Sequence, residues 1–151
     1  MQAVQPQLFQ PSAHLSPIRA KKLIVMDESV SVPQSTIESL SKRAIALSIT
    51  SHQDVFQVIS STLRCQRTIT CLHLFAQSQN GLIQCGHSVI DCNSIEQYSW
   101  DLHDWFVSVS NHVLMKRPQI HVHLRSSGLV QIEPNILSAL TQLTGAEVIV
   151  S

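Results

Sequence analysis

The sequence predicts a single α/β domain in which a mainly parallel sheet lies between two layers of helices, with a small β-hairpin beside it. Three observations support this fold class. Short apolar runs alternate along the chain with segments whose apolar residues recur every three or four positions. Polar or glycine-containing breaks separate the two kinds of segment. The 151 residues, of which 44% are hydrophobic and 13% charged, suffice for one well-packed core.

Residues 1–21 are rich in Gln, Pro and Ser and lack the periodicity of a helix or strand. We expect a disordered or loosely docked arm there, followed by the α/β domain over 22–151. Arg19, Lys21 and Lys22 give this end of the chain a net charge of +3. A basic arm could contact an acidic partner, but we favour a solvated tail because exposed charges are readily screened.

The first predicted strand is the apolar run 23–26, which ends at the acidic pair Asp27 and Glu28. Pro33 then opens a helix, because its fixed backbone angle suits the first helical turn. Segment 44–50 alternates between apolar and small or polar residues, as a second strand does.

Ser51 is the expected cap of the second helix, with Asp54 in its first turn. The nearly continuous apolar run 69–76 is typical of a central strand that is covered on both faces. It stops at the polar segment 77–81, which we interpret as a loop. Chemistry in open parallel sheets sits at such strand ends.

Two β-prone pieces, 82–85 and 88–90, predict the hairpin. Asn93 or Ser94 is the expected cap of one longer helix that continues to Val109, since apolar residues recur there at helical spacing.

Segment 120–124 predicts the fourth strand of the parallel sheet, and 126–128 is the expected loop at its end. Pro134 lies in the first turn of the last helix, which Gly145 ends. The final strand is 146–150. Strands that alternate with helices in this way require right-handed crossovers and a mainly parallel sheet.

Four stretches then indicate a family: LIVMDESV, LHLFAQSQNGLIQCG, DLHDWFVSVSNHVL and ALTQLTGAEVIVS. On these stretches the chain from Leu23 to Ser151 resembles a bacterial domain of unknown function that stands at the head of large, repeat-rich, cadherin-like surface proteins, notably in cyanobacteria. That family is similar to the caspase and gingipain fold. The resemblance implies a caspase-like topology.

The resemblance also implies a catalytic His at the end of the third strand and a catalytic Cys at the end of the fourth. This chain has Gln77 and Arg125 at those positions, and Ser78 and Leu124 where the family pattern has glycines. Glutamine cannot act as a base and arginine is no nucleophile. We therefore expect a degenerate, non-catalytic copy without a cofactor, which acts as a protein-binding or scaffold module.

If the resemblance holds, Gln77 and Arg125 lie close together at the carboxyl edge of adjacent parallel strands. Asp27 or Glu28 is then the expected charge partner of Arg125, and no deep polar pocket should remain between the strand ends. We expect the binding surface to include Arg125, Asp27 and Glu28 at this edge, together with Tyr98 and the exposed Trp100.

Two alternative functions stay open. Cys85 and His87, with Cys92 nearby, could form a displaced thiol–imidazole pair in a cysteine-dependent hydrolase, although neighbouring strand residues point to opposite faces. His121 and His123 share one strand face and His73 lies on the neighbouring strand, so a three-histidine zinc site is conceivable. We favour packing roles for these histidines and expect no metal.

The balance of ten basic and ten acidic residues leaves no broad positive field, which argues against nucleic acid as a partner. A protein partner or a larger assembly is expected instead. No apolar run reaches the length of a membrane span, and no secretory signal is evident. The four cysteines form no C-x-x-C pair, so free thiols in the cytoplasm are expected; the alternative, implied by the family, is secretion or surface display by a non-classical route.

Overall fold

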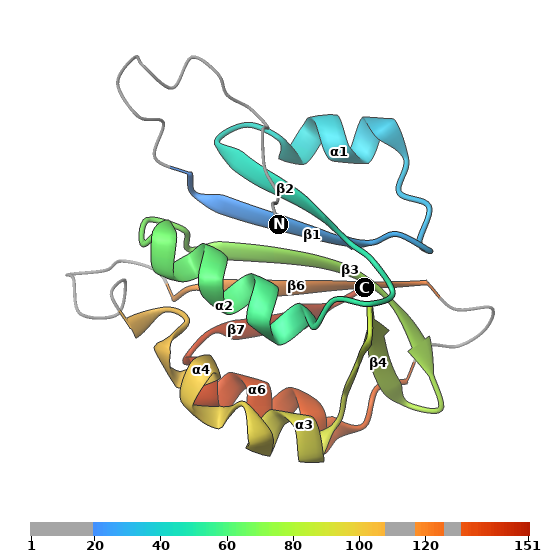
Figure 1. Cartoon of the computed structure of the whole chain (residues 1–151), viewed down its shortest axis with the longest axis vertical. Coiled ribbons are helices and arrows are strands. Elements are labelled where there is room, and N and C mark those ends of the chain that lie inside the picture. The colour runs from blue at the N-terminus through green and yellow to red at the C-terminus, as the bar shows by residue number, and fades with distance from the viewer. Residues whose placement is uncertain (1–19, 108–116, 126–130) are drawn as a thin grey trace.

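The computed structural model describes residues 20–107, 117–125 and 131–151 and places them around one seven-stranded sheet (Figure 1). Most of the expected arm, the expected loop 126–128 and the end of the predicted helix at 108–109 lie outside the described residues. The elements are β1 (Lys22–Asp27), α1 (Gln34–Leu40), β2 (Ala44–Ile49), α2 (Val55–Cys65), β3 (Cys71–Gln79), β4 (Leu82–Cys85), β5 (Ser88–Ile90), α3 (Cys92–Gln97), α4 (Ser99–Asp104), β6 (Gln119–Arg125), α6 (Pro134–Thr144) and β7 (Glu147–Val150).

The parallel part of the sheet has the strand order β2-β1-β3-β6-β7. The hairpin strands β4 and β5 add to β3 in antiparallel fashion. Registers are regular, so that Ile24, His73, His121 and Ile149 form one row across four neighbouring strands. The predicted mainly parallel sheet with a hairpin is confirmed.

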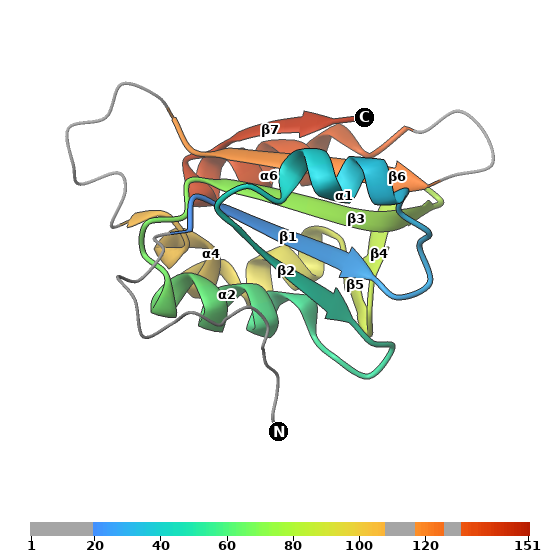
Figure 2. The same ribbon diagram turned by 90° about the horizontal axis from the view of Figure 1, so that it is seen from above.

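Helices cover both faces of the sheet, as predicted, but very unequally. Of the described helices, α1 alone lies on one face, and α2, α3, α4 and α6 lie on the other (Figures 1 and 2). The chain reverses direction once, since β2 lies on one side of β1 and all later parallel strands lie on the other. Right-handed crossovers then place the first helix on the opposite face from the rest. We call these faces the α1 face and the four-helix face.

The core fills the four-helix face. Alternate residues of the central strands point to it, among them Leu72 and Leu74 of β3 and Ile120 and Val122 of β6, all of them buried. By contrast, α1 has no buried residue. In the described part of the chain, no helix is long and apolar enough to cross a membrane.

The end of β3 differs from the prediction. We expected a loop at 77–81, but the strand continues to Gln79 because its polar residues pair with β4, Gln77 opposite Gln84. Only Asn80 and Gly81 form the turn, and both have positive φ values, 56° and 80°. Such angles suit a two-residue hairpin turn, for which Asn-Gly is a favoured sequence.

Three helix predictions are also corrected. Asp54, not Ser51, caps α2, because its Oδ1 accepts a hydrogen bond of 2.9 Å from the Phe56 amide. Asp91, not Asn93 or Ser94, caps the next helix through a capping box. The expected single helix is broken into α3 and α4 at Tyr98, whose φ of −103° and ψ of 22° leave the helical region.

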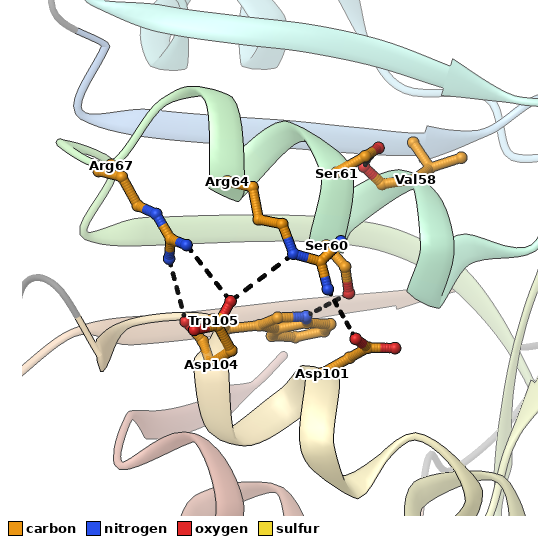
Figure 3. A network of polar contacts seen from close by, with 8 residues as sticks. All are labelled: Val58, Ser60, Ser61, Arg64, Arg67, Asp101, Asp104 and Trp105. Atoms are coloured by element: carbon orange, nitrogen blue, oxygen red, sulfur yellow. Dashed lines mark hydrogen bonds and ion pairs between the residues drawn. The ribbon is translucent and has the colours of Figure 1, made fainter.

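The contact between α2 and α4 joins a buried hydrogen bond to an exposed group of ion pairs (Figure 3). The buried Trp105 donates its indole N–H to Ser60 Oγ at 2.8 Å. Arg64 lies 2.8 Å from Asp101 and 3.7 Å from Asp104, which also pairs with the neighbouring Arg67. Asp101 and Asp104 therefore both have cationic partners on the surface.

Candidate functional site

The carboxyl edge between β1 and β3 is the point where the chain reverses direction, and ligands of open α/β sheets bind at such a point. β1 ends there at Asp27, and β3 and β6 bring Gln77 and Arg125 to the same edge. This edge is therefore the first candidate site.

Hydrogen bonds close the crevice around Asp27, which is 7% exposed. Its Oδ1 accepts from the Ser29 amide at 2.8 Å and from Ser29 Oγ at 2.7 Å. Its Oδ2 accepts from the Gly86 amide at 2.8 Å, which ties β1 to the hairpin. Burial raises the pKa of this carboxyl, but the hydrogen bonds from Ser29 and Gly86 outweigh burial and leave the pKa below its ordinary value. Asp27 is thus an ionised, fully engaged group.

Gln77 and Arg125 are direct register partners in adjacent parallel strands, so their predicted placement is confirmed. The Gln77 amide donates to Ser29 Oγ at 2.8 Å, which extends the Asp27 network across the strand ends. Within residues 20–107, 117–125 and 131–151, the expected ion pair of Arg125 with Asp27 or Glu28 is not formed. Asp27 is engaged by Ser29 and Gly86 instead, and Glu28 Oε2 accepts from the Ser51 amide at 2.9 Å.

An open hollow of about 320 Å³ lies beside Arg125 on the α1 face. It is lined by the β1–α1 loop and by the ends of β3 and β6, including Phe75 and His123. The hollow contains neither Gln77 nor Asp27 among its lining residues. The Asp27 and Gln77 side chains at the ends of β1 and β3 are both hydrogen-bonded to Ser29, and this hollow lies to one side of them.

Cys85 is the thiol that a displaced catalytic pair would use, and the fold makes it inert. It is completely buried. Burial, with a contribution from the negative charge of Asp27, raises the pKa of this thiol to about 12. His87 is exposed in the turn between β4 and β5. Cys92 is exposed at the start of α3.

A second concentration of reactive side chains lies on the α1 face. His73 stands directly opposite His121 in the register of β3 and β6, and Cys71 and His123 flank this pair on the same face. His73 Nε2 is 3.4 Å from Cys71 Sγ, and His73 Nδ1 is 3.1 Å from His123 Nε2. The His73 and His121 rings stack with centroids 4.7 Å apart. The three histidines proposed from the sequence are therefore brought together.

Two further polar residues complete this cluster. Gln119 Oε1 lies 3.1 Å from His121 Nε2, and Ser151 Oγ lies 3.2 Å from His123 Nδ1. Burial, and then the neighbouring His121 and His123, lower the pKa of His73 to about 4. Burial and His121 also lower the pKa of His123. The imidazoles of His73 and His123 are therefore neutral near pH 7, and each has one nitrogen lone pair that can accept a hydrogen bond or bind a metal ion.

The sequence reasoning missed Cys71 as a member of this cluster. The sequence pattern of a zinc knuckle is a C-x-x-C pair, and Cys71 belongs to none. The available signal was the spacing Cys71-x-His73, because residues two apart in a strand point to the same face. Gln119 is likewise two residues before His121 in β6. The register of β3 and β6 then places Gln119 opposite Cys71 and His121 opposite His73.

The aromatic residues proposed for an interface have different surroundings. Trp100 on α4 is 85% exposed. Tyr98 is partly buried, its ring stacks on Phe56 with centroids 4.6 Å apart, and its hydroxyl donates to Asp54. That hydrogen bond, with burial, raises the pKa of the Tyr98 hydroxyl. Tyr98 thus joins α2 to the α3–α4 break, whereas the Trp100 side chain is open to solvent.

Comparisons with known proteins place the chain in a family without assigning an activity. The sequence model of the domain of unknown function DUF4347 matches residues 23–151. No curated protein matches the sequence significantly. Among solved structures, a structure described as that of pro-sf-caspase-1 aligns over 77% of this chain and 49% of its own length, with a TM-score of 0.44 and 8% sequence identity. The chain thus spans about half of that structure. Because the family model covers most of its length, the chain belongs to the DUF4347 family.

Proposed function

We propose that this domain is a non-catalytic, caspase-like copy that works as a protein-binding module. The observation that carries the proposal is the pairing of Gln77 with Arg125 at the ends of β3 and β6. These are the positions at which the family resemblance implies a His–Cys dyad. An amide cannot take a proton from a nucleophile, and a guanidinium cannot attack a carbonyl carbon.

The surroundings of this pair support the same conclusion. Ser29 accepts a hydrogen bond from the Gln77 amide and donates to Asp27, so these groups satisfy one another rather than face a substrate. The alternative, a hydrolase that uses Cys85, has less support, since its thiol is inaccessible and protonated at neutral pH.

The proposed contact surface includes Trp100. An aromatic side chain that is 85% exposed has most of its apolar area to gain from a partner, and tryptophan is enriched among residues that dominate binding energy. On the same helix, Asp101 and Asp104 with their arginine partners supply charged neighbours, as the rim of an interface does. Arg125 and Glu28, exposed at the carboxyl edge, are further candidates for contact.

The proposed setting is the cytoplasm, in a larger assembly. The four cysteines are all free and two of them are exposed, which suits a reducing compartment. The resemblance to head domains of repeat-rich surface proteins favours assembly with other domains but would place them outside the cell. Fractionation of the native host with an antibody to this domain distinguishes the two settings.

The absence of catalysis is tested with a thiol-directed activity probe and a panel of peptide and ester substrates. We expect no turnover, and labelling of exposed Cys65 or Cys92 only. Turnover that Cys85→Ala abolishes would overturn the proposal. The variant Gln77→His with Arg125→Cys should fold but not hydrolyse efficiently, because Ser78 and Leu124 remain where glycines would let a substrate approach.

Partner binding is tested with a photo-crosslinking amino acid at position 100, and with the same group at position 138 as a control. Ser138 is also exposed and lies on α6. We expect one host protein to be crosslinked from position 100 only, and Trp100→Ala to weaken its binding at least ~10-fold in a purified assay. Equal crosslinking from both positions, or unchanged binding by Trp100→Ala, would contradict the proposed surface.

A further inference from the structure

We propose that Cys71, His73 and His121 bind a transition-metal ion of the zinc type on the α1 face of the sheet. The three side chains each offer one ligand atom, and these atoms all lie within 4.8 Å of one another. A thiolate with two imidazoles is a donor set that zinc prefers, whereas magnesium and calcium prefer oxygen ligands. This site is separate from the carboxyl edge and independent of the proposed partner surface.

The backbone fixes the arrangement. Cys71 and His73 are two residues apart in β3, so both project from the same face. His121 is the register partner of His73 in β6, one strand spacing away. The three ligands therefore come from two hydrogen-bonded central strands, which are the most rigidly placed segments of such a sheet.

The distances require only a small adjustment. Cys71 Sγ and His73 Nε2, 3.4 Å apart, already have the spacing of neighbouring ligands in a tetrahedral zinc site, about 3.3–3.6 Å. The remaining ligand must approach from at most 4.8 Å. His121 is half-buried and its ring stacks at 17° to His73, so a tilt of the His121 ring toward Cys71 closes the site. On binding, the Cys71 thiol releases its proton to solvent and coordinates as thiolate.

Neighbouring side chains can hold the imidazoles in the required tautomers. If His73 donates its Nδ1–H to His123 Nε2, the lone pair on His73 Nε2 faces Cys71. His123 is then protonated on Nδ1 and can donate that N–H to Ser151 Oγ. Gln119 Oε1 can accept the Nε2–H of His121, which leaves a lone pair on Nδ1. Partners of this kind orient metal-bound histidines and raise their basicity.

The cluster is also partly accessible from solvent. Cys71 and His121 are half-buried, and α1, the described helix on this face, buries none of its residues. Lys22 lies beside Cys71 on β1, and its ammonium group donates to the Leu40 carbonyl oxygen at 3.4 Å. With three protein ligands, a fourth position stays open to water or to a side chain from outside the cluster.

The experiment uses the full chain without a histidine tag, freed of metal with a chelator. Zn²⁺ is titrated in competition with a chromophoric chelator, and Co²⁺ is added separately as a spectroscopic probe. We expect one equivalent of Zn²⁺ to bind, and Co²⁺ to give a thiolate-to-cobalt charge-transfer band with the intense visible bands of a tetrahedral site. Zn²⁺ should also raise the melting temperature.

Variants then assign the ligands. Cys71→Ser and His121→Gln should each lower zinc affinity at least ~10-fold and remove the zinc-dependent rise in melting temperature, with circular dichroism confirming the fold. Cys65→Ser and His103→Gln, both exposed and outside the cluster, are the matched controls and should bind zinc normally. Binding weaker than micromolar, or binding unchanged by Cys71→Ser and His121→Gln, would overturn the site. Because the measurements read metal binding alone, failure here leaves the partner proposal unaffected.

Discussion

The two faces of one sheet differ in almost every property. On the four-helix face, alternate residues of the central strands are apolar and buried, and four helices pack against them. On the α1 face, the same strands present Cys71, His73, His121 and His123, and the one described helix there buries none of its residues. Each strand contributes to both faces, so the difference arises from alternation along single strands.

One short chain thereby separates the apolar side chains that stabilise the fold from a cluster of polar and reactive side chains. Apolar burial on the four-helix face supplies the dominant favourable free energy, because it grows with the area removed from water. Polar side chains on the α1 face should contribute less to stability, since of the four only His73 is buried and Cys71, His121 and His123 are half-buried. We therefore expect substitutions of these half-buried residues to leave the fold intact.

The largest expected effect comes from comparing truncations on the two faces of the central strands β3 and β6. Leu74→Ala removes a 4% exposed side chain from the core and should lower the free energy of unfolding by about 3 kcal/mol. His121→Ala, on the α1 face, should cost about 1 kcal/mol or less, because its ring is only half-buried. Urea unfolding at pH 7.5 measures both. Equal losses would remove the distinction between the faces.

A large effect is also expected where the hairpin meets the end of β2. Gly86 has a φ of 61°, and a Cβ there would lie 2.4 Å from Ile49 Cγ2 and 2.7 Å from the Gln53 carbonyl oxygen. Gly86→Ala should therefore destabilise by about 2–4 kcal/mol through strain and steric overlap. Gly145→Ala is the control, with a φ of 74° and no atom within 4 Å, and should cost about 1 kcal/mol. If Gly86→Ala lowered the free energy of unfolding no more than Gly145→Ala does, the hairpin would be able to move away from Ile49 and Gln53 without cost.

Much of the fold could be predicted from the sequence, because its signals are local. Apolar runs gave the parallel strands, and Pro134 and Gly145 gave both ends of α6. The break at Tyr98 could not be predicted, since it depends on stacking against Phe56 and bonding to Asp54, which lie more than forty residues away in the chain. Caps at Asp54 and Asp91 were misplaced because several capping residues stand close together.

The position of the carboxyl-edge site could be predicted from the sequence, but the hydrogen-bond partners of its side chains could not. Adjacent parallel strands fix where Gln77 and Arg125 must lie, once the strand order is known. The partner of Asp27 depends on the hairpin, which brings the Gly86 amide to a carboxylate 59 positions earlier in the chain. Local sequence patterns contain no information on such a contact. Strand order and alternation already predicted that His73, His121 and His123 lie near one another, but their individual contacts depend on the exact register of β3 and β6.

A moderate, pH-dependent effect should distinguish the faces under acid. The pKa of His73 is lowered to about 4 in the folded protein, against 6.5 for the ordinary side chain. Because the folded state binds fewer protons, this contribution to stability is complete above about pH 6.5 and is lost as the pH falls toward 4. We expect the free energy of unfolding to fall by about 1–2 kcal/mol between pH 7.5 and 4.5, less than the full pKa shift would give, because the structure can relax around the buried ring when it is protonated.

The measurement is urea unfolding across that pH range, with His73→Gln as the test variant and Asp27→Asn as the control. His73→Gln should flatten the dependence between pH 6.5 and 4.5. Asp27→Asn should leave the slope between pH 6.5 and 4.5 unchanged. The pKa of Asp27 is lowered in the folded protein, so the stability that its ionised form contributes is lost only below about pH 4. An unchanged slope in His73→Gln would show that the imidazole is hydrated in the folded protein.

The smallest effect is expected at the junction of α2 and α4, two helices of the four-helix face (Figure 3). It tests whether ion pairs or buried contacts hold these two helices together. Arg64→Ala removes the ion pairs with Asp101 and Asp104, but the Arg64 side chain is 50% exposed. Exposed pairs contribute little, so the loss should be about 0.5 kcal/mol or less and should shrink further in 0.5 M salt. Trp105→Phe, at the same junction, leaves the buried Ser60 hydroxyl without its donor and should cost about 1–2 kcal/mol at any salt concentration. If Arg64→Ala lowered the free energy of unfolding more than Trp105→Phe, surface charge rather than buried contacts would hold α2 to α4. Apolar burial would then not be the main source of stability on the four-helix face.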